Sequence, residues 1–165
     1  NNYENLIDSA TKEIENFISN EESDYLMQYH KENFNLNKKG NFMWRGTEVI
    51  DIGELPKFKE LKNKFNNLVK SEDKDHVVSY FQIVRWPTGE WQPPHLDLYG
   101  HTYSSILYLN DDYEGGETVV LNETAAPKKN KIIFFRGNRL IHKVNEITKG
   151  VRYTVPCWYK YESKS

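Results

Sequence analysis

The spacing of apolar residues changes near residue 76. Before this point, apolar side chains recur at every third or fourth position with charged residues between them, as in amphipathic helices. This spacing predicts helices over residues 6–18, 25–34 and 58–71. The segment between the second and third helices, residues 36–56, contains three glycines among apolar residues. There we predict a loop with one short strand.

From Val77 onward, apolar and polar residues alternate, which is the period of a β-strand. Proline, glycine, asparagine and aspartate separate the alternating segments. The predicted strands are 77–85, 101–110, 117–121, 131–135, 142–144 and 151–159. Several short strands joined by regular turns are typical of an antiparallel barrel or jelly roll. The sequence therefore predicts an α+β, mainly β fold, a double-stranded β-helix (jelly-roll) barrel with N-terminal supporting helices.

The length of 165 residues suits one domain with its own core, and no linker or repeat divides the chain. We expect a single domain, in which residues 1–75 are mostly helical support and residues 76–162 form the jelly-roll core. The formal charge of −2, without a basic stripe, argues against a nucleic-acid partner. No apolar run reaches the length of a membrane span. The single cysteine, Cys157, and the lack of a signal-peptide pattern predict a cytoplasmic protein.

Three residues in and beside the predicted strands carry side chains that bind metals. His95 and Asp97 are two positions apart, so on a strand both point to one face. His142 stands 47 residues further on, in an otherwise apolar strand. Two imidazoles and one carboxylate form the facial set that leaves open positions on Fe(II), and these mixed donors suit Fe(II) or Mn(II) more than structural zinc. Taken singly, each residue also has an ordinary explanation, as a surface aspartate or a histidine bonded to a backbone carbonyl.

Arg152 follows His142 by ten residues and offers a planar fork of donors for a carboxylate. Strand alternation allows two orientations here. In one, Arg152 faces the interior with Thr154 and Trp158, where its charge needs an anion. In the other, Arg152 faces solvent and a more apolar set fills the interior, namely Val151, Tyr153, Val155 and Cys157. Periodicity alone favours the second orientation.

The ordered series of motifs from Trp86 to Trp158 resembles the 2-oxoglutarate and Fe(II)-dependent dioxygenases of the prolyl 4-hydroxylase type. The matching segments are Gly89, His95-Leu96-Asp97, Ser105–Asn110, Tyr113–Thr118, Pro127, Ile132–Phe135, His142–Val144, Gly150–Tyr153 and Trp158. Each segment is short, but the order of all of them is specific. The resemblance covers somewhat under half of the chain, and residues 1–75 carry no motif that matches.

By this resemblance, the Fe(II) ligands are His95, Asp97 and His142. Arg152 pairs with the distal carboxylate of 2-oxoglutarate, and Tyr108 donates a hydrogen bond to the same group. Trp158 and Trp86 line this pocket. O2 is the second co-substrate, and ascorbate is an optional cofactor. The implied reaction hydroxylates a prolyl residue of a peptide or protein, with release of succinate and CO2, and no catalytic residue beyond the metal ligands is assigned.

Two positions depart from the family's pattern, because Trp86 and Gln92 stand where tyrosine is frequent. An indole donates one hydrogen bond and accepts none. Neither departure falls on an iron ligand, so the iron site stays intact, but both bear on the identity of the substrate. We expect a proline-containing segment to lie in extended form between the Gly40–Gly53 stretch, Trp86 and Trp91. The alternatives are hydroxylation of another residue or of a small molecule, and a non-catalytic metal-binding jelly-roll module.

Overall fold

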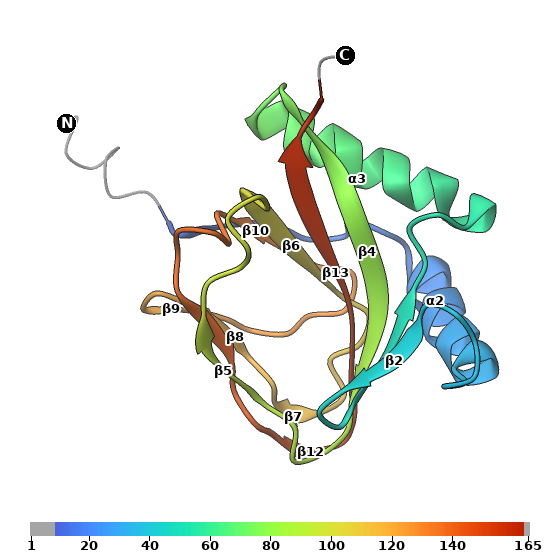
Figure 1. The fold of residues 1–165 in the computed structure, drawn as a ribbon. Coiled ribbons are helices and arrows are strands. Elements are labelled where there is room, and N and C mark those ends of the chain that lie inside the picture. Colours follow the sequence, from blue (N-terminus) through green and yellow to red (C-terminus); the bar gives the residue numbers. More distant parts are fainter. Residues whose placement is uncertain (1–8, 164–165) are drawn as a thin grey trace.

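The computed structural model describes residues 9–163, and Figure 1 shows its elements. Within this range the α-helices are α2 (Asn20–Asn33) and α3 (Lys59–Glu72), and a 3-10 turn, η1 (Pro56–Phe58), precedes α3. The strands are β1 (Thr11–Ile14), β2 (Asn41–Trp44), β3 (Thr47–Asp51), β4 (His76–Trp86), β5 (Gln92–His95), β6 (Tyr103–Tyr108), β7 (Glu114–Gly115), β8 (Thr118–Val120), β9 (Glu123–Ala125), β10 (Ile132–Phe135), β11 (His142–Val144), β12 (Ile147–Lys149) and β13 (Arg152–Tyr161).

Two antiparallel sheets form the body of the fold. The large sheet has the strand order β1-β10-β6-β13-β4-β3-β2, and the small sheet has the order β5-β11-β8-β9. Strands β12 and β7 pair separately, at the lower end of the view in Figure 1. The predicted jelly roll with few helices is confirmed.

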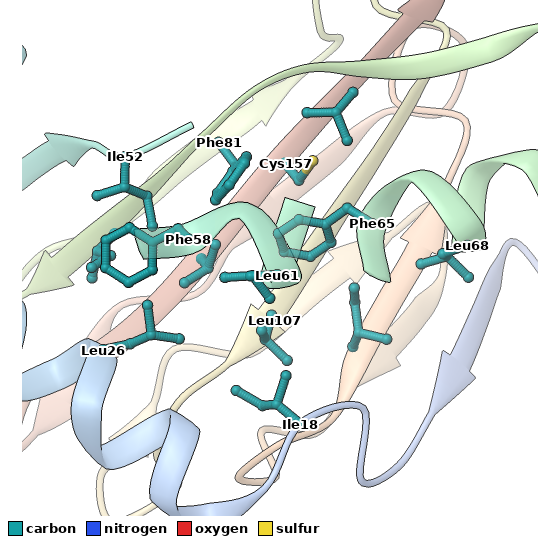
Figure 2. Packing of buried hydrophobic residues seen from close by; sticks show 14 of the residues in the cluster. Ile18, Leu26, Ile52, Phe58, Leu61, Phe65, Leu68, Phe81, Leu107 and Cys157 are labelled. Carbon is teal, nitrogen blue, oxygen red and sulfur yellow. The ribbon is translucent and has the colours of Figure 1, made fainter. Parts of the chain in front are cut away.

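Both helices lie along the large sheet (Figure 1). Helix α2 begins with a capping box, in which Ser19 and Glu22 each accept a hydrogen bond from the other's backbone N–H. Helix α3 buries a stripe that includes Phe65, whose ring lies 5.1 Å from that of Phe81 on β4. Figure 2 shows this apolar layer between helix and sheet, with Phe65, Phe81 and Cys157 close together. The helix predicted over 58–71 is confirmed, and the helix predicted over 25–34 is present but begins five residues earlier, at Asn20. Neither helix has the length and hydropathy of a membrane-spanning segment.

The helix predicted over residues 6–18 is wrong where the structure describes it. Residues 6–8 lie outside the described range, and Thr11–Ile14 form β1, which pairs with β10. The edge of β10 offers backbone donors and acceptors, and pairing with them outweighs the helical spacing of a short segment. Residues 36–56 likewise hold two strands, β2 and β3, instead of one, with Arg45 at φ +55° in the turn between them.

Strand β13 runs through the interior of the large sheet and is buried on both faces. Tyr153 and Val155 pack into the core beneath the helices. Arg152, Thr154 and Trp158 point the other way, toward the small sheet, and line a cavity. Both alternating sets of side chains are therefore inside the fold, and Arg152 has the inward orientation that periodicity alone did not favour.

Candidate metal centre and its cavity

The small sheet brings His95, Asp97 and His142 together. His95 ends β5 and His142 begins β11, and these two residues are direct partners in the antiparallel register. Oδ1 of Asp97 lies 3.3 Å from Nε2 of His142 and 3.6 Å from Nε2 of His95. Ligand atoms bound about 2.1 Å from one ion, at right angles to each other, lie about 3 Å apart. The three side chains therefore have the spacing of ligands around a single metal ion.

Backbone carbonyls fix both imidazole rings. Nδ1 of His95 lies 2.8 Å from the carbonyl oxygen of Pro93, and Nδ1 of His142 lies 2.8 Å from that of Leu140. A carbonyl only accepts, so each Nδ1 carries a proton. Each Nε2 points at Asp97: it donates to the carboxylate when it is protonated, and it offers its lone pair when a metal ion takes the place of that proton. Both Nε2 atoms and the Asp97 carboxylate converge on one point. Such a group of donors is favourable only with positive charge between them, which fits a divalent cation.

Asp97 is held in its charged form. Burial raises the pKa of this carboxyl, but hydrogen bonds with His142, His95 and Ser104 outweigh burial and hold the pKa well below its ordinary value. The same contacts act on His95, whose pKa burial lowers and whose bonds to Asp97 and the Pro93 carbonyl raise above its ordinary value. The site thus keeps a carboxylate ligand at neutral pH and attracts positive charge.

Between the two sheets lies a cavity of about 310 Å³, into which the triad and Arg152 both point. Arg152 is 1% exposed, and its Nε and Nη2 donate to the Gly116 carbonyl and the Thr118 hydroxyl, at 2.9 and 3.1 Å. The guanidinium carbon lies 4.7 Å from the ring centre of Trp86. Among residues 9–163, no aspartate or glutamate forms an ion pair with Arg152. A buried cation without an acidic partner is costly, so this end of the cavity suits an anionic ligand.

Tyr108 lies behind this end of the cavity and does not line it. Its ring is fully buried, and its hydroxyl bonds to Thr118 Oγ1 at 2.7 Å. Thr118 therefore connects Tyr108 to Arg152. Thr118 is a residue that sequence reasoning missed, although it belongs to the Tyr113–Thr118 motif and lies on a strand.

The other predicted pocket residues divide into two groups. Trp86 and Trp158 line the cavity, and the buried indole nitrogen of Trp86 has no hydrogen-bond partner within residues 9–163. Trp158 stacks on Tyr80, with ring centres 4.5 Å apart. Trp91 is absent from the lining and is half exposed, with the Arg45 guanidinium 5.0 Å from its ring centre. The β2–β3 hairpin does reach the cavity, through Phe42 and Trp44.

Two glycines make room for the site. Gly116 has φ +69°, and a Cβ there would lie 3.0 Å from Arg152 Cδ. A Cβ at Gly137 would overlap Asp97 Oδ2, and the Gly137 carbonyl accepts from the Asp97 N–H at 2.8 Å. The role of Gly137 was not predicted, because its contact with Asp97 depends on the fold and not on a local motif.

Comparisons with known proteins agree with this geometry. Residues 81–160 match the 2OG-Fe(II) oxygenase superfamily. Human prolyl 3-hydroxylase 2 is 34% identical over 77 residues, which are 42% of this chain and 11% of the human protein. A PKHD-type hydroxylase of Pseudomonas putida is 35% identical over 82 residues, 46% of this chain and 33% of that protein. The chain thus matches only about a tenth to a third of the length of these relatives.

Solved structures share the fold over nearly the whole chain. The viral collagen prolyl hydroxylase of Paramecium bursaria Chlorella virus-1, in complex with 2OG, superposes with a TM-score of 0.74 at 20% identity, over 94% of this chain and 97% of that one. A prolyl hydroxylase of Trichoplax adhaerens, in complex with a hypoxia-inducible factor peptide, gives 0.74 at 17% identity, over 96% and 86%. The resemblance predicted from sequence is therefore confirmed: residues 81–160 match the 2OG-Fe(II) oxygenase superfamily, and the chain shares its fold with solved prolyl hydroxylases.

Proposed function

We propose that the protein is an Fe(II)- and 2-oxoglutarate-dependent hydroxylase. The observation that carries the proposal is that one cavity contains both the His95–Asp97–His142 triad and a buried arginine, Arg152, that has no acidic partner in the described part of the chain. The keto acid end of 2-oxoglutarate has oxygens for a metal, and its distal carboxylate matches a guanidinium. When bound, Fe(II), 2-oxoglutarate and O2 supply the oxidation that inserts one oxygen atom into a C–H bond and releases succinate and CO2.

The residues of the chain bind and orient these groups. Arg152 offers the N–H donors that Gly116 and Thr118 leave free to the distal carboxylate, while those two contacts fix the plane of the guanidinium. Tyr108 acts in this proposal through the Thr118 hydroxyl, by setting which way that hydroxyl points. Trp86 offers a further buried N–H to a ligand in the cavity.

We propose a prolyl residue of a peptide or protein as the group that is hydroxylated. The relatives named above support this substrate class, since they include prolyl hydroxylases and one structure with a bound peptide. The cavity itself supports an apolar ring, because Trp158, Phe42 and Trp44 line it. We further propose that residues 1–165 act as one dioxygenase domain, in which the helices support the sheet that forms the cavity wall. The cytoplasmic location stays a prediction from the sequence.

The test incubates the protein with Fe(II), 2-oxoglutarate, O2, ascorbate and a library of proline-bearing peptides. Mass spectrometry should find one oxygen atom added on proline, and one succinate should form for each proline hydroxylated. His142→Ala should abolish both. Oxygen added to another residue or to a metabolite, with peptidyl proline unchanged, would replace the prolyl substrate by one of the alternatives. A protein that binds iron but forms no succinate, even in the uncoupled reaction, would be a non-catalytic binding module.

A further inference from the structure

Strand β2 is an edge strand without the usual protection of an edge. Within residues 9–163 the two main sheets end in four strands, β1, β2, β5 and β9. Charged side chains or prolines normally protect such an edge, because its unpaired backbone groups otherwise pair with another chain. Strands β1 and β9 carry charged residues and β5 carries two prolines. Strand β2 carries neither, and its residues Phe42, Met43 and Trp44 are each at least 38% exposed.

The register of β2 with β3 shows which backbone groups point to the open edge. The Asp51 N–H donates to the Gly40 carbonyl at 2.9 Å, next to the first pair of this register, so Gly40 is in a hydrogen-bonded pair. Such pairs alternate with pairs that are not hydrogen-bonded. Phe42 and Trp44, two and four positions further on, therefore also bond to β3. Met43 lies between them, so its N–H and C=O point away from β3.

The open edge borders the cavity. Phe42 and Trp44 line the cavity, so Met43 points to the opposite face of the sheet. His95 on β5, the edge strand of the small sheet, lines the cavity as well. The side chain of His95 is 26% exposed. A chain that lies along β2 is therefore beside the cavity and on the side from which a metal ligand is accessible.

We propose that the substrate binds as an additional antiparallel strand on the open edge of β2. This inference rests on the proposed hydroxylase function and specifies how the substrate is held. One substrate residue, which we call the central residue, lies opposite Met43 and exchanges both backbone hydrogen bonds with it. Its side chain points away from the cavity, as the Met43 side chain does. The residues before and after it lie opposite Phe42 and Trp44, and their side chains point into the cavity.

This geometry accepts proline at the positions that face the cavity. Substrate residues opposite Phe42 and Trp44 turn their backbone groups away from β2, because only alternate residues bond across the pair. Proline has no N–H, so at these positions no hydrogen bond to β2 is lost. Opposite Met43, in contrast, proline would leave the Met43 carbonyl without a donor. The edge therefore fixes a register in which a prolyl ring points into the cavity.

The variant Met43→Pro tests the added strand from the side of the protein. It removes the free N–H of the edge, and it keeps the ladder to β3 because that ladder does not use this N–H. The control Met43→Leu keeps the N–H and an apolar side chain of similar size. The probe is the peptide of the proline-bearing library that binds most tightly, by calorimetry, to protein loaded with Mn(II) and 2-oxoglutarate. Its dissociation constant should rise about fivefold or more in Met43→Pro, the effect of one lost hydrogen bond. It should stay near the wild-type value in Met43→Leu, and 2-oxoglutarate affinity should be unchanged in both variants.

Ester bonds in the same peptide test the added strand from the side of the substrate. An ester in place of the amide N–H of a residue next to proline removes a donor that faces β2. At one of these two positions at least, binding should weaken about fivefold. The same replacement two residues from proline removes an N–H that points away from β2, so binding should not change. Hydrogen exchange at the Met43 amide should slow when the unmodified peptide binds.

Three results would overturn the added strand. One is equal peptide affinity in wild type and Met43→Pro, and another is a library in which no peptide binds. The third is a wild-type dimer that Met43→Pro converts to a monomer in sedimentation equilibrium, which would assign the edge to a second copy of the chain. Succinate formation in the uncoupled reaction does not require the edge, so each of these results leaves the hydroxylase proposal in place. Absence of succinate with wild-type protein would instead reject the hydroxylase proposal.

Discussion

Replacement of Arg152 by methionine tests the anion site directly. The change removes the guanidinium but keeps an unbranched apolar side chain beside Trp86. A hydrogen bond that involves a charged group contributes about 1.5–3 kcal/mol, and Arg152 is almost fully buried, so water does not replace the lost donors. One such bond corresponds to a loss of roughly ten- to hundredfold in affinity. We therefore expect the Michaelis constant for 2-oxoglutarate to rise at least about tenfold.

The assay measures succinate formed in the uncoupled reaction against 2-oxoglutarate concentration, together with calorimetric titration of 2-oxoglutarate into the Mn(II)-loaded protein. Iron affinity should stay near the wild-type value, since the triad does not contact Arg152. Arg152→Lys should give an intermediate result, because lysine keeps the charge but not the planar fork. The matched control is Arg85→Met, since Arg85 pairs with Glu48 at 3.2 Å and does not line the cavity.

Thermal unfolding separates a binding role from a structural one. Removing a buried cation that has no acidic partner among the described residues relieves a desolvation cost, which offsets the loss of its two hydrogen bonds to Gly116 and Thr118. The melting temperature of Arg152→Met without 2-oxoglutarate should therefore not fall. An unchanged 2-oxoglutarate constant combined with a lower melting temperature would refute the anion site and leave Arg152 a structural residue.

Three further predictions concern the metal, the glycine beside Arg152 and a buried histidine. His142→Ala should reduce iron from one ion per chain to much weaker binding, and anaerobic titration with unaltered stoichiometry and affinity would contradict the triad. Gly116→Ala, with its φ of +69° and a Cβ 3.0 Å from Arg152 Cδ, should raise the 2-oxoglutarate constant without changing iron affinity, as measured in the same two assays. Burial lowers the pKa of His30 more than its contact with the Glu48 carbonyl raises it, so below about pH 6.5 the unfolded chain binds the proton first and the free energy of unfolding falls. The loss of melting temperature between about pH 7.5 and pH 5.5 should be smaller in His30→Leu than in wild type, and equal losses would show that His30 does not contribute.

The spacing of residues along the chain was sufficient to predict those parts of the site that lie close together in sequence. His95 and Asp97 share a face because they are two apart, and this holds for any extended segment. Thr118 was not predicted, because its importance depends on contacts with Arg152 and Tyr108, which are 34 and 10 residues away. Such contacts depend on how the sheets stack, and a single sequence contains no direct signal for this.

Alternation also gave no answer where a strand has two buried faces. On β13, Tyr153 faces the helices and Arg152 faces the cavity, and both are buried. From the sequence, the apolar face with Tyr153 and the mixed face with Arg152 look like alternatives for the interior. In the fold, both faces of the strand are interior. The opposite error occurred at Thr11–Ile14, where helical spacing was present but the edge of β10 was a better partner. Strand β5 is absent from the predicted strands; it contains Pro93 and Pro94, which are tolerated because β5 is an edge strand.

The two ends of the cavity are each tied to both sheets. Asp97 follows a strand of the small sheet and accepts a hydrogen bond from Ser104 on β6 of the large sheet. Arg152 belongs to the large sheet and donates to Thr118 on β8 of the small sheet. The separation between the metal ligands and the anion site is therefore set by two cross-sheet hydrogen bonds and not by the flexibility of one loop. A ligand that contacts both the metal ligands and Arg152 needs this separation to be constant. If one end of the cavity shifts, the ligand loses its correct orientation as well as binding energy. The helices also help to keep this separation constant, because they pack on the large sheet, which carries Arg152 and Ser104.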